Sequence, residues 1–216
     1  MARRLVIKWA TGAKVTARLE MPADAGPTGV LLAHGAGAGQ DHPFMVTLRD
    51  ALAAHGLPVM TFNYAYTEAG RKAPDRLPKL LAVHRAAADR LATYCDRVVI
   101  AGKSMGGRAG SQLVGDDGWP AAALVYYGYP LVALGKGTPR DTSHLRAITA
   151  PQLFFAGTRD RLSPPDLVVP MAKTLPSATA EVVEGGEHSF KVPKASRRTH
   201  EEVIQGLAAI TADWLR

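Results

Sequence analysis

The chain has 216 residues with 47% hydrophobic content, enough for a sizeable core, and we expect one domain covering residues 1–216. No apolar stretch reaches the roughly 18 residues of a membrane helix, and the apolar run after Arg4 ends at Lys8, too early for a signal peptide. These features exclude a membrane protein and predict a cytoplasmic one. The single cysteine, Cys95, agrees with a reducing compartment, and its place before a predicted strand argues against a catalytic thiol.

The net charge of +7 raises the question of nucleic-acid binding. The basic residues are dispersed, however, and the densest cluster, Arg197-Arg198, lies in a predicted helix without interleaved aromatic residues. We therefore expect a solvated basic surface and no nucleic-acid partner. The sequence contains no repeat and no linker-like tract.

The predicted elements begin with two apolar runs, Leu5–Trp9 and Val15–Leu19, which indicate an antiparallel pair joined at Thr11-Gly12. After them, short buried strands alternate with helical segments, a pattern typical of a mostly parallel α/β sheet of about 7–8 strands flanked by helices. The later strands are predicted at Gly29–Ala33, Pro58–Phe62, Val98–Ala101, Ala122–Tyr126, Gln152–Ala156 and Ala180–Val183. The helices are predicted at Pro43–Ala54, Leu77–Tyr94, Gly106–Val114, Pro165–Leu175 and Thr199–Arg216. Ligands of such sheets bind at the carboxyl ends of the strands.

The third of these later strands leads directly into Gly102-Lys103-Ser104-Met105-Gly106. A buried strand followed by Gly-x-Ser-x-Gly and a helix is typical of a nucleophile elbow, so Ser104 is the candidate nucleophile. Glycine at the two flanking positions leaves space for the crowded turn, and the helix start presents free N–H groups. The alternative is a chance match in a chain with 21 glycines.

The glycine-rich runs around Ser104 and after Ala33 do not match the two common nucleotide-binding motifs. A phosphate loop needs a glycine five positions before its Gly-Lys pair, where Arg97 stands. A dinucleotide fingerprint beginning at Gly35 needs glycine or alanine at the position of Gln40. We therefore expect no nucleotide cofactor.

The loop after Gly29–Ala33 has the sequence His34-Gly35-Ala36-Gly37-Ala38-Gly39. Residues this small leave backbone N–H groups unshielded, as an oxyanion hole requires, and we expect the N–H groups of Ala36 and Met105 to be its two donors. The alternative is a flexible glycine loop. His34 is assigned a structural role in which its ring fixes the loop.

Two further residues complete a candidate triad. His188 follows the last predicted strand and Asp160 follows the strand before it, so the chain order Ser104, Asp160, His188 is that of one hydrolase class. Asp160 would hold the tautomer of His188 and stabilise its imidazolium. Asp166 and Glu187 are weaker alternatives, because the first lies inside the next helix and the second adjoins His188.

Several motifs together give the chain a family resemblance. The runs that carry it are Leu32 to Gly39, Asp41 to Met45, Glu68 to Pro74, Gly102 to Arg108, Gly157 to Asp160 and His188 to Pro193. From about Val30 to Trp214 the chain resembles small α/β-hydrolases related to dienelactone hydrolases. Within that group it is most similar to bacterial proteins that share a hydrolase-like domain with a subunit of the animal NSL chromatin-acetylation complex.

The candidate triad predicts a serine hydrolase that works through an acyl-enzyme, and it needs no metal or organic cofactor because water completes the turnover. We expect a small ester, thioester or short peptide-like amide as substrate. Dienelactone hydrolases carry cysteine at the position of Ser104, which counts against their particular chemistry. Residues 127–151 are too few for the helical lid of a lipase, so we expect a shallow site. The alternative is an interaction module that keeps the site without using it, against which the intact triad argues. The sequence leaves the oligomeric state open.

Two expectations concern the substrate. Tyr66 and Tyr127 lie at strand ends and are candidates for lining the acyl pocket, although such tyrosines equally serve packing. Five cationic residues lie in loops that the fold gathers near the strand ends: Arg71, Lys72, Arg159, Arg161 and Lys191. Either they give the cleft a positive potential that attracts anionic substrates, or they point outward.

Overall fold

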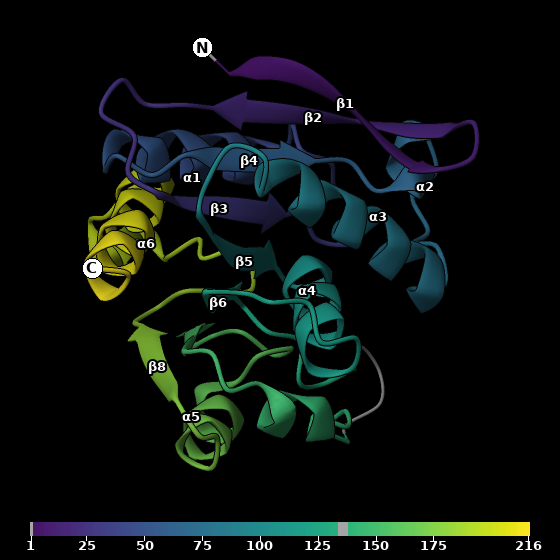
Figure 1. The fold of residues 1–216 in the computed structure, drawn as a ribbon. Helices are drawn as coiled ribbons and strands as arrows, with labels where there is room; N and C mark the ends of the chain where they lie inside the picture. Colours follow the sequence, from purple (N-terminus) through teal and green to yellow (C-terminus); the bar gives the residue numbers. More distant parts are fainter. Residues whose placement is uncertain (1, 134–137) are drawn as a thin grey trace.

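The protein is described by a computed structural model that covers residues 2–133 and 138–216. One sheet of eight strands runs through the described residues in the order β1-β2-β4-β3-β5-β6-β7-β8 (Figure 1). β1 pairs antiparallel with β2, β2 pairs antiparallel with β4, and every later neighbour is parallel. The strands are β1 Arg3–Ala10, β2 Ala13–Glu20, β3 Thr28–Ala33, β4 Val59–Phe62, β5 Arg97–Lys103, β6 Ala123–Tyr127, β7 Gln152–Gly157 and β8 Ala178–Val183. The predicted α/β class and mostly parallel sheet are thereby confirmed.

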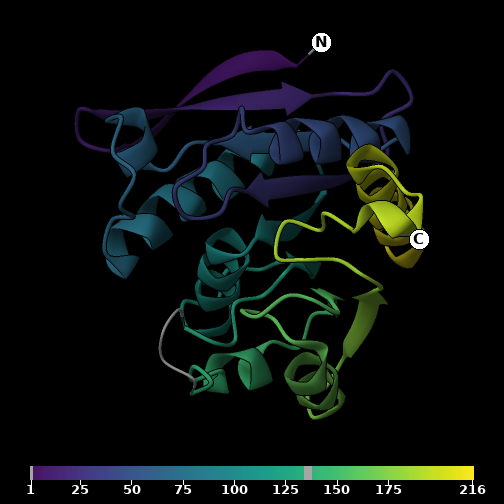
Figure 2. The ribbon, with the colours of Figure 1, turned by 180° about the vertical axis from the view of Figure 1, so that it is seen from behind.

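Helices cover both faces of the sheet, as the two opposite views in Figures 1 and 2 show. The helices are α1 Pro43–Ala54, α2 Ala65–Glu68, α3 Leu77–Leu91, α4 Met105–Gly115, α5 Pro165–Lys173 and α6 His200–Trp214. α1 and α6 pack over one face, and α3, α4 and α5 pack over the other. Side chains of a strand alternate between faces, so Val30 and Leu32 of β3 join the first apolar layer, and Leu31 and Ala33 join the second.

Local signals set several helix starts. α1 spans the predicted residues, with Pro43 in its first turn and the His42 ring accepting a hydrogen bond from the Phe44 N–H. α6 follows a capping box in which Thr199 and Glu202 bond each other's backbone N–H groups. These contacts satisfy N–H groups that a helix start leaves free.

Other boundaries differ from the predictions. α3 ends at Leu91 instead of Tyr94, because the chain turns there and the Tyr94 N–H donates to the Leu91 carbonyl. The short helix α2 and the 3₁₀ segments Ser143–Ala147 and Lys194–Ser196 were not predicted. Elements of one turn are too short to give a periodic pattern.

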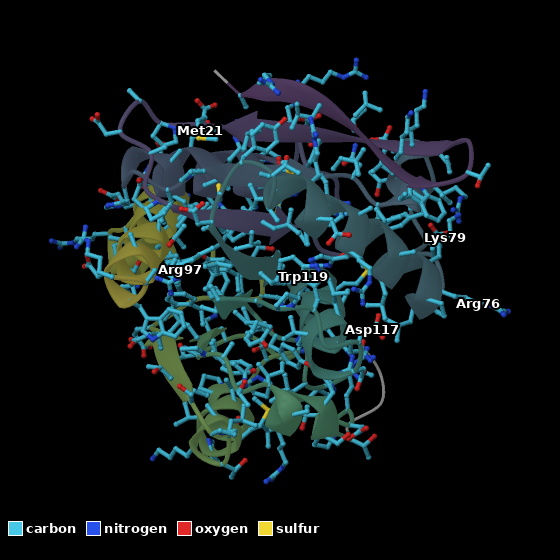
Figure 3. The ribbon with its side chains drawn as sticks, in the orientation of Figure 1. Met21, Arg76, Lys79, Arg97, Asp117 and Trp119 are labelled. Atoms are coloured by element: carbon cyan, nitrogen blue, oxygen red, sulfur yellow. The ribbon has the colours of Figure 1, made fainter. Side chains whose placement is uncertain are left out.

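Side chains also fasten the connection that follows α4. Trp119 and Asp117, both labelled in Figure 3, belong to this connection. The Trp119 indole N–H donates to Asp89, and Asp117 forms an ion pair with Arg85, so both side chains hold the connection against α3. The thiol of Cys95 packs against β3, where a Cβ built on Gly29 would stand 2.5 Å from Sγ.

The connection between β6 and β7 borders the carboxyl ends of the strands. Its described part holds one 3₁₀ segment, Ser143–Ala147, and forms no large lid. In the described residues, no helical lid therefore covers the carboxyl ends of the central strands.

None of the helices described has the length and hydropathy needed to cross a bilayer.

Candidate active site

Ser104 alone forms the turn between β5 and α4, with φ 50° and ψ −115°. A positive φ is uncommon for a residue with a side chain, so close packing must hold this backbone in place. The Ser104 N–H donates to the Tyr127 carbonyl at 3.1 Å. A Cβ on Gly102 would collide with Gly107, and one on Gly106 would stand 2.5 Å from the Ala33 carbonyl oxygen. The elbow therefore requires glycine on both sides of Ser104.

The structure brings Ser104, His188 and Asp160 together from three loops. His188 Nδ1 lies 2.8 Å from Asp160 Oδ2, and His188 Nε2 lies 2.9 Å from Ser104 Oγ. A carboxylate only accepts, so Nδ1–H donates to Asp160, and the Ser104 hydroxyl donates to the free Nε2. The serine oxygen thus faces a base that can take its proton.

Backbone hydrogen bonds hold the Asp160 carboxylate independently of His188. Its Oδ1 accepts from the backbone N–H groups of Leu162 and Ser163 at 2.8 and 3.1 Å. Burial by itself would raise the pKa of Asp160, but the hydrogen bond and charge of His188, with the Leu162 N–H and the Lys103 charge, hold this pKa below its ordinary value. The carboxylate therefore stays ionised and buried beside His188.

The predicted oxyanion donors lie on the wall of the same cavity. Ala36, Met105, Ser104 and His188 all line it. Neither the Ala36 nor the Met105 N–H donates a hydrogen bond to any other residue that the structure describes. Met105 is also the first residue of α4, where helix N–H groups have no partner within the helix. Both groups are available to a ligand oxygen beside Ser104.

His34 occupies a different environment from His188. Its ring is completely buried, Nδ1–H donates to the Gly35 carbonyl at 2.8 Å, and Nε2 accepts from the Tyr64 N–H at 3.2 Å. Burial, opposed by the Gly35 hydrogen bond and reinforced by His42, lowers the pKa of His34 to about 4. The ring fastens the loop after β3 to the segment after β4, as the predicted structural role requires.

Lys103 is the unusual residue of the elbow. The residue is 8% exposed, and Nζ has no hydrogen-bond partner among the described residues. The ammonium lies 5.8 Å from the centre of the Phe190 ring. Burial lowers the pKa of Lys103 to about 8, against the opposing charges of Asp160 and Glu187. A positive charge therefore stands beside the Asp160–His188 pair.

The cavity in front of Ser104 has a volume of about 790 Å³. Apolar side chains form much of its wall: Phe44, Met45, Leu80, Val132 and Leu162. This size and lining suit a small organic molecule. Within the part of the chain that the structure describes, no three His, Cys, Asp or Glu side chains are placed to hold a metal ion.

A family model described as an alpha/beta hydrolase domain matches residues 27–216. The chain belongs to the α/β-hydrolase family. No curated protein sequence matches this α/β-hydrolase.

Solved structures share the fold of this α/β-hydrolase at low sequence identity. Est1E from Butyrivibrio proteoclasticus is 16% identical, with a TM-score of 0.75 over 98% of both chains. An alpha-beta serine hydrolase homologue from Coxiella burnetii is 17% identical, with a TM-score of 0.77 over 99% of this chain and 97% of its own. A dienelactone hydrolase from Anabaena variabilis is 19% identical, with a TM-score of 0.74 over 99% of this chain and 96% of its own. At these identities the likeness establishes the fold.

The two tyrosines expected to contact substrate lie elsewhere in this α/β-hydrolase. Tyr66 and Tyr127 are completely buried, and neither is among the described residues that line the cavity. The Tyr127 hydroxyl hydrogen-bonds with Thr211 of α6, and the Tyr66 hydroxyl is directed at the Gly35 carbonyl. Tyr66 lies in α2 and not at a strand end, and Tyr127 ends β6 under α6, so both rings pack in the core. Their expected role in substrate binding is corrected to packing.

The cations near the site also differ from those expected. The five predicted ones are exposed, and none is a described lining residue: Arg71, Lys72, Arg159, Arg161 and Lys191. Instead Lys103, Arg108 and Arg140 line the cavity of this α/β-hydrolase. Sequence reasoning missed Arg108, although its place four residues after Ser104, one helical turn along α4, was a usable signal.

Proposed function

We propose that this α/β-hydrolase is a serine hydrolase that cleaves a small ester or thioester through an acyl-enzyme. The observation that carries the proposal is the continuous set of hydrogen bonds from Ser104 through His188 to Asp160, which opens onto a cavity. The proposal treats residues 1–216 as one hydrolase domain in the cytoplasm. Names such as alpha-beta serine hydrolase and dienelactone hydrolase among the structural neighbours support this reaction class.

In the proposed mechanism, Ser104 Oγ attacks the ester carbonyl carbon while His188 Nε2 takes the hydroxyl proton. The carbonyl oxygen becomes an oxyanion and accepts hydrogen bonds from the Ala36 and Met105 N–H groups. The C–O or C–S bond then breaks, and the leaving group receives the proton from His188. Water, deprotonated by His188, releases the acid from Ser104 by the same steps in reverse order.

Asp160 acts through His188. Its ionised carboxylate holds Nδ1–H, which leaves Nε2 free to accept the serine proton, and it stabilises the imidazolium formed during attack. The two backbone N–H groups on Oδ1 keep the carboxylate oriented throughout. Proton transfer at Nε2 thus needs no rearrangement of the acid.

The test combines a fluorophosphonate probe with a panel of p-nitrophenyl esters and acyl-CoA thioesters of graded chain length. The wild type should be labelled and active, and Ser104→Ala should lose labelling and about 10⁶-fold in kcat while keeping its Tm. The thioester arm decides which acyl bond is preferred. An active Ser104→Ala protein would end the proposal, and an unlabelled, inert wild type would favour the interaction module.

A further inference from the structure

The cavity beside Ser104 has an uneven charge. Lys103, Arg108 and Arg140 line it, whereas none of its described lining residues is an aspartate or glutamate. Lys103 faces the charges of Asp160 and Glu187, so its charge is partly balanced. The two arginines are therefore the cations to explain.

Arg108 is the fourth residue of α4, four residues after the nucleophile. Its Nη1 donates to the Tyr129 hydroxyl at 3.3 Å, and Nη1 and Nη2 both donate to the Asp141 carbonyl oxygen at 3.2 Å. Each of these acceptors is neutral. The guanidinium is held in place at the cavity wall and forms no ion pair among the described residues, although the exposed Asp141 carboxylate interacts with its charge.

Arg140 reaches the same cavity from the connection between β6 and β7. Its backbone N–H donates to the Leu131 carbonyl at 2.6 Å, which fixes the start of the side chain. The side chain is exposed and makes no hydrogen bond or ion pair with any other described residue. Arg140 therefore presents its guanidinium donors to whatever enters the cavity.

Carboxylates close in sequence to the cavity lining are already engaged. Asp141 accepts from the Ser143 N–H and hydroxyl, and Asp75 pairs with Arg71 and Lys79. Asp141 is exposed and acts on Arg108 without forming an ion pair, so it balances the charge at the cavity only in part. A guanidinium can donate two parallel hydrogen bonds to one carboxylate, and this pair of bonds is strongest where water is partly excluded.

We propose that Arg108 and Arg140 form a subsite for an anionic group, a carboxylate, carried by the ester that Ser104 cleaves. The inference rests on the proposed function and names its substrate class. The Arg108 backbone N–H donates to the Ser104 carbonyl oxygen at 3.1 Å, so Arg108 stands about one helical turn, roughly 5.4 Å, from the nucleophile, and a carboxylate a few bonds from the scissile carbonyl suits this spacing. Short esters of dicarboxylic acids or of hydroxy acids have this spacing.

The experiment compares each anionic ester with a neutral ester of the same shape. Monomethyl succinate is compared with methyl isocaproate for a carboxylate on the acyl side, and acetoxyacetate with isobutyl acetate for one on the alcohol side. In at least one pair, kcat/KM should favour the anion by about 10-fold or more. The preference should weaken at 1 M salt, where the screening length is about 3 Å.

Arg140→Met is the decisive variant, because the side chain has no hydrogen bond or ion pair to the described residues to lose, and Arg108→Met accompanies it. Each should lower kcat/KM for the anionic ester and so bring the ratio of anionic to neutral ester close to one. Arg97→Met is the matched control: Arg97, labelled in Figure 3, lies exposed at the opposite end of β5 and does not line the cavity. It removes the same charge and should leave the ratio unchanged.

Equal kcat/KM within both pairs would overturn the subsite and leave the proposed hydrolase standing. An equal loss of preference in Arg97→Met would also overturn it, since net charge alone would then explain the effect. Binding of monomethyl succinate and acetoxyacetate to Ser104→Ala, measured by calorimetry, is independent of turnover. Weaker binding of the preferred anion in Ser104→Ala/Arg140→Met but not in Ser104→Ala/Arg97→Met supports the subsite even if no ester is hydrolysed.

Discussion

The loops after β3 and β8 look alike in sequence, since each joins a histidine to small glycine-rich surroundings, His34-Gly35 in one and Gly186-Glu187-His188 in the other. Their surroundings differ. His34 is 0% exposed and both ring nitrogens bond to main-chain groups, whereas the His188 side chain is 26% exposed and bonds to two side chains. A ring held by backbone on both sides fixes a loop. A ring between a hydroxyl and a carboxylate, at the wall of a cavity, can move a proton.

The largest expected difference between the loops is catalytic. His188→Ala removes the base, so kcat for a reactive ester should fall on the order of 10⁶-fold. Asp160 keeps its two backbone N–H partners in this variant, so Tm should change by only a few degrees. Steady-state kinetics with p-nitrophenyl acetate and a thermal melt measure both quantities.

His34→Ala should lower stability strongly and activity only moderately. The variant loses two buried hydrogen bonds and leaves a void, so the free energy of unfolding should fall by about 2–4 kcal/mol. Activity should fall far less than in His188→Ala. Urea denaturation gives the first quantity. An inactive His34→Ala protein as stable as the wild type, beside an active His188→Ala protein, would exchange the two assignments.

The buried ring of His34 also predicts a pH dependence of stability. Mainly because of burial, the pKa of His34 is about 4 in the folded protein against 6.5 for the ordinary side chain. As pH falls below 6.5 the unfolded chain takes up this proton first, so stability present above pH 6.5 is lost progressively down to pH 4. For His34 the loss is about 3 kcal/mol. Urea denaturation between pH 7 and pH 4 should be less pH-dependent in His34→Gln, and parallel curves would contradict this prediction.

A pair of glycines provides the smallest test. Gly37, in the loop after β3, and Gly128, after β6, both have φ 71°, so alanine at either costs about 1 kcal/mol. A Cβ on Gly37 meets nothing within 4 Å, while one on Gly128 would lie 3.2–3.4 Å from Lys103 Nζ, Asp160 Oδ2 and His188 Nδ1. Gly128→Ala alone should therefore lower kcat, by about 10-fold. If the two variants had the same kcat, the predicted crowding of the Asp160–His188 pair by a Cβ at position 128 would be wrong.

Sequence reasoning reached most of the fold and the proposed triad because their signals are local. A buried strand that ends in Gly-x-Ser-x-Gly sets Ser104, and in a parallel sheet Asp160 and His188 must emerge at the same edge. The short helix α2 gave no such signal. α3 ends three residues early because a turn, which periodicity does not resolve, forms at Leu91.

The residues that line the cavity were harder to predict. Tyr127 sits at a strand end, but whether it faces substrate or core depends on α6, which supplies Thr211 from far along the chain. Arg140 lies in a connection without a repeating pattern. Its arrival at the cavity depends on tertiary contacts such as the bond to Leu131. Local sequence patterns carry no information about contacts between segments that are far apart in the chain.

The buried position of Cys95 allows local opening of the protein to be measured by thiol labelling. This is the chain's one cysteine, its thiol is packed against Gly29 of β3, and burial raises its pKa, which keeps it from the reactive thiolate form. A thiol reagent such as Ellman's reagent can react when the segment between α3 and β5 moves away from Gly29. The rate of labelling in native buffer therefore reports how often this segment opens, with no added fluorophore and no engineered residue.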